Sequence, residues 1–135
     1  TLNIRLNEQS LKVCVDELKD GTARAVTKQV QLDLINYGKV EMFLHAEGDA
    51  LDDQLTAFLR LGDDVDSNYY EIEVPLKITP QGSINPSEVW PELNEINMDL
   101  NQLYALKSER DRLNISDQNA GKSRFELGKM ALHWS

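Results

Sequence analysis

The sequence is poor in the residues that build disulfide-bonded, zinc-binding and membrane-spanning proteins. Its 135 residues include one cysteine, Cys14, and two histidines. A single cysteine excludes an internal disulfide and any zinc site made from paired cysteines. No apolar run approaches the ~20 residues that a transmembrane helix needs. The chain opens without methionine in an already alternating stretch, so we expect no signal peptide within it and expect it to be a fragment of a longer protein.

Positive charge is also scarce. The sequence has 23 acidic against 14 basic residues, a formal net charge of −9. Such a field repels phosphate backbones and anionic lipids, and no stretch concentrates lysine and arginine between aromatic residues. Nucleic acid and anionic membrane surfaces are therefore not expected as partners. Hydrophobic residues make up 41% and charged residues 27%, which predicts one soluble domain over residues 1–135 with a core of its own.

Apolar and polar residues alternate along three stretches, which are residues 40–47, 55–61 and 70–78. Successive side chains of a strand point to opposite faces, so this period predicts strands with one dry side. Phe43 is the exception, an apolar residue on the polar face. Pro75 lies on the outward face and has no N–H for a ladder, which predicts a sheet edge or a bulge there.

Weaker alternation predicts further strands over residues 2–6, 10–16, 23–30 and 125–134. Cys14 falls in one of them, and we expect its thiol to be buried and inert. Turn residues separate the strands, and this spacing predicts a mainly β fold, a two-layer antiparallel β-sandwich of jelly-roll type. A single-sheet α+β arrangement is the alternative. One short amphipathic helix is predicted over residues 101–113, after an extended proline-rich loop at 79–91.

Two acidic loops, residues 49–53 and 63–66, flank the strand at 55–61 and could supply oxygen ligands for Ca²⁺. Asp63, Asp64 and Asp66 are the weak calcium candidates, since residues 64–68 resemble the start of an EF-hand loop. Tyr69 and Pro75 then occupy the positions where such a loop needs glycine and a bidentate glutamate. Solvated loops without a metal are therefore the preferred interpretation.

Aromatic residues could form a ligand-stacking platform from Trp90 and Tyr69, although packing is the preferred role. We expect Trp90 to anchor the long loop to the sandwich. His45 and Glu47 share the polar face of a strand and lack the paired cysteines of a zinc deaminase. No nucleophile elbow or histidine-based triad is present. The sequence therefore predicts a protein that is not an enzyme and has no cofactor.

Several phrases occur in a characteristic order, among them ARAV at 23–26, MFLHAE at 42–47, LTAFLRLGD at 55–63, NYYEIEVPLKITP at 68–80 and VWPELNE at 89–95. Over roughly residues 7–110 this set resembles an internal segment of the SprA (Sov) family of Bacteroidetes. Members of that family form a very large outer-membrane β-barrel. This barrel is the translocon of the type IX secretion system and is required for gliding motility.

The resemblance implies a non-catalytic structural or interaction domain of that translocon, with the parent protein in the outer membrane. The alternation lacks the outward apolar band and aromatic girdles of membrane strands. We therefore expect a monomeric insertion on the extracellular or periplasmic side that does not itself span the membrane. Its partners would be other secretion-system proteins and the rest of its own barrel chain. The alternative is a carbohydrate-binding module that contacts cell-surface polysaccharide.

Overall fold

A computed structural model describes the backbone of residues 10–64, 68–116, 124–127 and 130–134, and the side chains as far as Arg112. The chain divides into two units, residues 1–31 and residues 32–135. The predicted strand over residues 2–6 lies outside the described residues.

The described part of the first unit, residues 10–31, contains no helix or strand. Its one turn places Gly21 at φ +75° and lets the N–H of Thr22 donate to the carbonyl of Lys19 at 3.0 Å. The strands predicted over 10–16 and 23–30 are therefore wrong. Alternation provides a dry face, but a strand also needs a hydrogen-bonded neighbour. Cys14 is free and exposed, so its predicted burial is wrong too.

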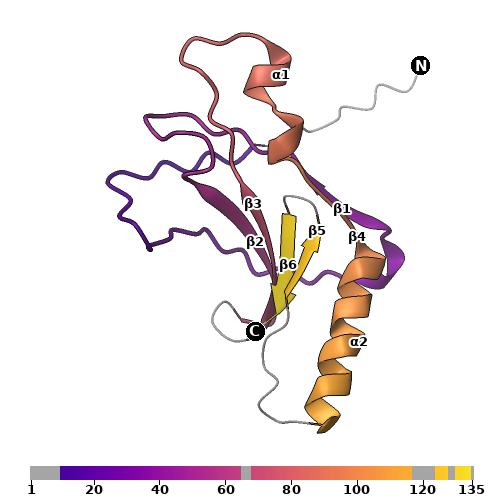
Figure 1. Cartoon of the computed structure of the whole chain (residues 1–135). Helices are drawn as coiled ribbons and strands as arrows, with labels where there is room; N and C mark the ends of the chain where they lie inside the picture. Colours follow the sequence, from indigo (N-terminus) through magenta and orange to yellow (C-terminus); the bar gives the residue numbers. More distant parts are fainter. Residues whose placement is uncertain (1–9, 65–67, 117–123, 128–129, 135) are drawn as a thin grey trace, which may run out of the picture. The chain divides into compact units, whose positions relative to one another are not determined.

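The second unit contains two antiparallel sheets (Figure 1). The four-stranded sheet has the order β2 (Thr56–Gly62), β3 (Tyr69–Pro75), β6 (Met130–Trp134) and β5 (Arg124–Leu127). The two-stranded sheet pairs β1 (Lys39–Met42) with β4 (Ile96–Asp99). The strands predicted over 55–61 and 70–78 are confirmed. The strand predicted over 40–47 ends early at Met42, and the one over 125–134 is a hairpin of two strands.

β3 lies inside its sheet and nevertheless contains a proline, Pro75. Among the described residues, β6 pairs with β3 from Tyr70 to Glu73. Pro75 forms the last pair of β3, opposite Thr56 of β2. Within the described ranges, β2 alone pairs with β3 at Pro75, so the missing N–H leaves the β3–β6 ladder from Tyr70 to Glu73 intact.

The β2–β3 hairpin depends on a glycine at the end of β2. A Cβ atom added to Gly62 would lie 2.1 Å from the backbone oxygen of Asn68. This distance is far shorter than any non-bonded contact, so the returning chain can approach β2 only because Gly62 has no side chain.

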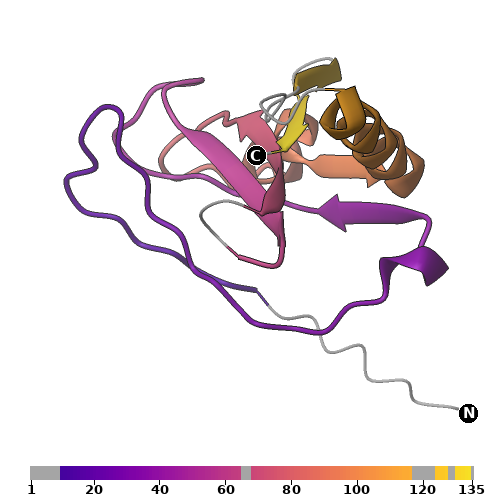
Figure 2. The same cartoon turned by 90° about the horizontal axis from the view of Figure 1, so that it is seen from below.

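The helices are η1 (Leu34–Asn36), α1 (Pro86–Val89), η2 (Glu92–Asn94) and α2 (Leu100–Ser116). α2 confirms the helix predicted over 101–113. β4 runs directly into it (Figure 2), and the carboxylate of Asp99 accepts from the N–H of Asn101 at 2.8 Å at its start. The predicted loop over 79–91 holds the short helix α1.

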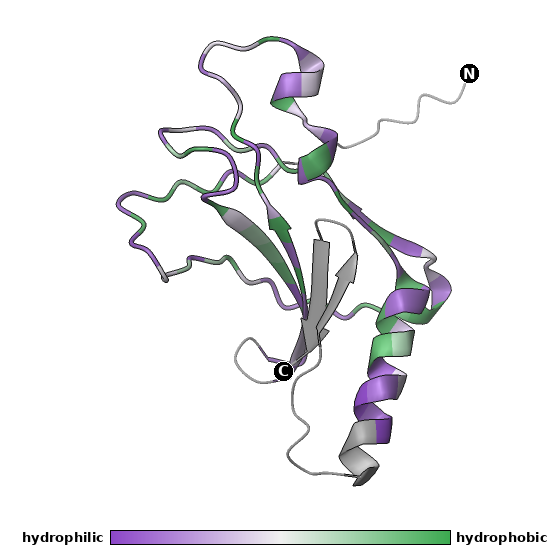
Figure 3. Cartoon of the chain, viewed as in Figure 1, coloured by the Kyte–Doolittle hydropathy of each residue, from purple (hydrophilic) through white to green (hydrophobic). Residues whose placement is uncertain are grey.

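One core joins both sheets to α2. Its buried residues are Ile72 and Val74 from β3, Ile96 and Met98 from β4, and Leu100, Leu103 and Leu106 from α2. Beyond Leu106 the described part of α2 is mostly hydrophilic and exposed (Figure 3). The helix therefore contributes its first half to the core.

The fold prediction is confirmed in part. Antiparallel sheets and a helix are present, but the described residues show no sandwich or jelly roll. The second sheet has only two strands, and α2 contributes to the core where a sandwich would have further strands. The sequence pattern of each strand could not reveal this, because helices and sheets cover an apolar face equally well.

Two tyrosines at the core differ in how their hydroxyl groups are satisfied. The hydroxyl of Tyr104 donates to the carbonyl of Leu34 at 2.9 Å. The hydroxyl of Tyr70 is buried and has no hydrogen-bond partner among the side chains that the structure describes. A buried polar group without a partner costs about 1–3 kcal/mol, whereas a satisfied one contributes about 1 kcal/mol.

We expect Tyr70→Phe to raise the free energy of unfolding by about 1 kcal/mol, because it removes the unsatisfied hydroxyl and leaves the ring. Tyr104→Phe is the matched control and should lower the free energy of unfolding by about 1 kcal/mol. Urea denaturation of both variants measures the two changes. Equal destabilisation by both substitutions would contradict this reading of Tyr70.

The same tyrosine should shape stability at high pH. Burial is the main cause that raises the pKa of Tyr70 above its ordinary value. The folded state therefore holds this proton more tightly than the unfolded chain. The resulting stability is fully present below about pH 10 and is lost as the pH rises through the pKa of the folded state. Tyr70→Phe should make this alkaline decline shallower.

Candidate functional site

The acidic loop before β2 holds the chain that follows β3. The side chain of Asp52 accepts from the N–H of Ile78 at 2.8 Å, and the N–H of Asp53 donates to the carbonyl of Leu76 at 2.8 Å. The ammonium group of Lys77 binds Asp53 at 2.6 Å, and this hydrogen bond is the main cause that raises the pKa of Lys77. Asp52 and Asp53 thus stabilise the segment that follows β3 and are not purely solvated charges.

Asn94 also binds the segment that follows β3. Its side chain has no exposed area. The amide oxygen accepts from the N–H of Lys77 at 2.7 Å, and the amide nitrogen donates to the carbonyl of Lys77 at 2.8 Å. This pair of bonds replaces the partner strand that the segment would otherwise need. It joins η2 to the end of β3.

A second set of polar contacts fixes the end of α1. The hydroxyl of Thr79 donates to the carbonyl of Glu88 at 2.9 Å. Nδ1 of His45 lies 2.7 Å from the carbonyl oxygen of Val89. A carbonyl can only accept, so Nδ1 carries the hydrogen in this bond. His45 therefore positions the residue that comes just before Trp90.

Trp90 is held firmly and is still half exposed. Its backbone N–H donates to the carbonyl of Pro86 at 2.8 Å, and its ring lies 5.6 Å from the ring of His45, at a tilt of 55°. Half of the residue, 50%, is exposed. Trp90 thus contacts His45 and leaves half of its surface open to solvent.

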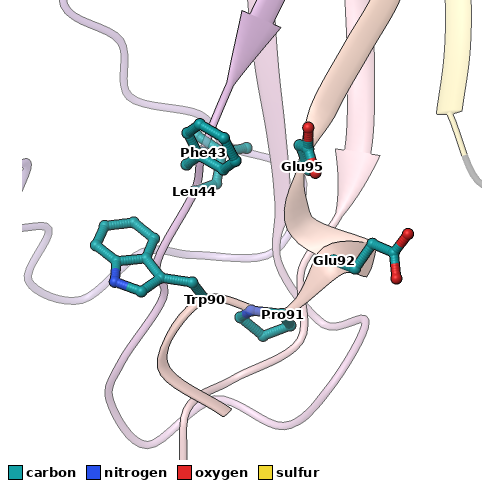
Figure 4. Close-up of a pocket in the computed structure, with 6 residues that line it drawn as sticks. All are labelled: Phe43, Leu44, Trp90, Pro91, Glu92 and Glu95. Carbon is teal, nitrogen blue, oxygen red and sulfur yellow. The ribbon is translucent and has the colours of Figure 1, made fainter. Parts of the chain in front are cut away.

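A small pocket of about 170 Å³ opens beside this ring (Figure 4). It lies just beyond the last pair of the β1–β4 ladder, Met42 with Ile96, where the two chains separate. The lining residues are Phe43, Leu44, Trp90, Pro91, Glu92 and Glu95. The pocket thus combines an aromatic wall with two carboxylates.

Further charges adjoin the pocket on β1. The ammonium group of Lys39 binds the carboxylate of Glu41 at 2.5 Å. Their hydrogen bond is the main cause that raises the pKa of Lys39 and lowers the pKa of Glu41. Glu95 lies close enough to influence both groups. Lys39 is thus occupied by Glu41, and the pocket keeps a negative character.

Tyr69, the other predicted stacking residue, lies elsewhere. The guanidinium group of Arg60 covers its ring at 4.1 Å and also binds the buried carboxylate of Glu71. Tyr69 begins β3, whereas Trp90 is held beside the chain that follows β3. At about 3.3 Å per residue, a seven-residue strand separates its ends by about 20 Å. The structure therefore does not bring Tyr69 and Trp90 together.

The predicted calcium ligands lie in the loop after β2. Asp64 accepts from the backbone N–H of Asn68 at 3.0 Å and from its side-chain amide at 2.6 Å, which closes the hairpin. Asp63 donates its N–H to the carbonyl of Asn68, and Asp66 is outside the described residues. In the part of the chain that the structure describes, no three metal-binding side chains gather. The calcium site stays a prediction.

A comparison with known families identifies the chain. The SprA_N model, described as a motility related/secretion protein, matches residues 1–126. The chain belongs to the SprA_N family. No curated protein matches it. The resemblance that the ordered phrases indicated is confirmed, and the SprA_N family is one of secretion and motility proteins rather than a known enzyme family.

The residues that line the pocket all lie within the part of the chain that matches the SprA_N family. Among the described residues of this SprA_N domain, no helix is long and apolar enough to cross a membrane. Sequence reasoning had singled out Trp90 but missed Phe43, Glu92, Glu95 and Asn94. Phe43 had given a signal, since it is the one apolar residue on the polar face of its stretch. Phe43 is 63% exposed because its side chain lines the pocket and does not pack in the core.

Proposed function

We propose that this chain is a non-catalytic structural and interaction domain of the type IX secretion translocon that supports gliding motility. The membership of residues 1–126 in the SprA_N family carries the proposal. The parent protein lies in the outer membrane, and this chain forms one monomeric domain of it on the extracellular or periplasmic side. Its partners are other secretion-system proteins and the rest of its own barrel chain.

The geometry around Trp90 supports an interaction role. Surface aromatic rings that are fixed in place and partly exposed are typical of contact residues in protein interfaces. Here Asn94, Thr79 and His45 together hold the segments that present Trp90. A domain whose surface ring is held by this many internal bonds is suited to docking another protein.

The proposal is tested by an in-frame replacement of residues 1–135 in the parent protein with a flexible glycine–serine linker. We expect loss of cargo from the culture medium and loss of spreading on agar, because the domain would no longer contact its partners. Immunoblots of outer-membrane fractions provide the control, since the parent must still be present at its ordinary level. Normal export and normal gliding at that level would contradict the proposal.

A carbohydrate-binding module is the second candidate, and the half-exposed ring of Trp90 favours it. The position of Tyr69 weighs against it, because Arg60 covers that ring and the two aromatic residues form no common platform. Binding of cell-surface polysaccharide that is lost in Trp90→Ala would support this candidate.

A further inference from the structure

The pocket beside Trp90 is too small for most ligands other than a single side chain. Its volume of about 170 Å³ lies below the ~300–1,000 Å³ of typical small-molecule sites. An oligosaccharide or a cofactor would find little enclosure there. One long side chain that projects from an approaching polypeptide would be enclosed on several sides.

The chemistry of the lining selects among side chains. Phe43 and Trp90 provide aromatic surface, and Glu92 and Glu95 add negative charge beside it, with the carboxylate of Glu92 directed away from Trp90 (Figure 4). Aromatic faces attract cations, and a guanidinium group can stack on a ring while its N–H groups bind a carboxylate. Arginine uses both features at once, because its fork of donors matches a carboxylate and its plane matches a ring.

Glu92 is available to an incoming cation, whereas Glu95 already interacts with Lys39 and Glu41. Within the described residues, Glu92 forms no ion pair. Lys39, the nearby ammonium group, binds Glu41. The net charge of −9 adds a long-range field that attracts basic partners and repels acidic ones.

The aromatic wall is also ordered before any partner arrives. The bond from Trp90 to Pro86 and the bond from His45 to Val89 fix the backbone on which the indole sits. A ring that is already positioned loses little conformational entropy on binding, so more of the contact energy appears as affinity.

We propose that this pocket binds an arginine side chain from an extended basic segment of a partner protein. The guanidinium group stacks on Trp90 in the negative field of Glu92 and Glu95, while Phe43 covers the aliphatic part of the side chain. This inference rests on the proposed interaction function and names the chemistry of the partner.

The test uses the whole 135-residue chain and short glycine–serine peptides that differ at one central residue. The probes carry arginine, citrulline or glutamate there. Citrulline keeps the shape of arginine but has no charge. We expect the arginine peptide to shift the indole N–H signal of Trp90 in NMR spectra. The citrulline peptide should bind roughly fivefold more weakly, and added salt should weaken only the arginine peptide.

Variants locate the binding in the pocket. The double substitution Glu92→Gln and Glu95→Gln should weaken the arginine peptide roughly tenfold. Asp16→Asn with Glu17→Gln is the matched control, since it removes the same charge from exposed residues that do not line the pocket. This control should leave affinity within about twofold. Trp90→Ala and Phe43→Ala each remove one aromatic side chain from the pocket. Circular dichroism verifies that each variant is folded.

Three results would overturn the proposal. One is binding of no peptide, and another is equal binding of arginine and citrulline. The third is a neutral oligosaccharide that shifts the Trp90 signal with an affinity that Glu92→Gln does not change, which would favour the carbohydrate-binding role. None of these results alters the outcome of the deletion in cells, so failure of this inference and failure of the proposed function are distinguishable.

Discussion

Asn94→Ala should lower the free energy of unfolding by about 2–3 kcal/mol. The substitution removes both bonds to Lys77 and leaves a partly buried N–H and carbonyl without partners. Each orphaned group costs about 1–3 kcal/mol, moderated here because water can reach part of the segment. Chemical denaturation of the wild-type and variant proteins measures the difference.

Asn97→Ala is the matched control for this substitution. Asn97 lies on β4, three residues further along the chain, and its side chain is exposed. Removing it should change the free energy of unfolding by less than about 0.5 kcal/mol. The two variants lose the same atoms, so their difference reports the two hydrogen bonds of Asn94. Equal effects would mean that Asn94 does not hold the end of β3.

The Asn94 variant should also disturb the pocket. Asn94 ends η2, and that 3₁₀ turn begins with Glu92, one of the pocket carboxylates. We expect the indole signal of Trp90 and the amide signals of residues 92–95 to shift in NMR spectra, while Asn97→Ala leaves them in place.

Leu106→Ala should lower the free energy of unfolding by about 3 kcal/mol. Leu106 has no exposed area, and it packs with residues of β3, β4 and α2. Truncation to alanine removes buried apolar surface and leaves a cavity, and the two losses together usually reach about 2–5 kcal/mol. Alanine is the best helix former, so the loss cannot be attributed to helix propensity.

Leu51→Ala is the control for this second prediction. Leu51 is 68% exposed in the loop before β2, so the same truncation should change the free energy of unfolding by less than about 0.5 kcal/mol. Thermal unfolding followed by circular dichroism compares the two variants. If Leu106→Ala is as stable as Leu51→Ala, the packing of α2 on β3 and β4 is not as described.

The strands with the strongest alternation were predicted well, and the reason is local. In β3, Ile72 and Val74 are both buried as their period requires. In α2, Leu103 and Leu106 lie on the face that joins the core. Such patterns record which face of an element is covered, and that information is contained in a few consecutive residues.

β4 and the pocket could not be predicted in the same way. Ile96 and Met98 alternate with Asn97 over only four residues, too few to separate a strand from a loop by period. Glu92 and Glu95 are ordinary surface residues in the sequence. They become part of a site because η2 carries them to the end of the β1–β4 ladder, next to Phe43.

The opposite error occurred at residues 10–16. Leu11, Val13 and Val15 alternate as a strand would, yet all three are exposed and the segment forms no strand in the described structure. The period of a segment describes what it could pair with. Whether it pairs depends on a neighbouring backbone that is not encoded within the segment.

The order of its phrases was enough to assign this chain to a family of secretion and motility proteins, because that assignment needs only the residues themselves. Periodicity likewise identified β2, β3 and the main helix. The tertiary structure alone decided that α2 packs on strands of both sheets and that Trp90 stands half exposed between aromatic and acidic neighbours. Those features depend on contacts between residues that lie far apart in the chain, and no local pattern specifies them.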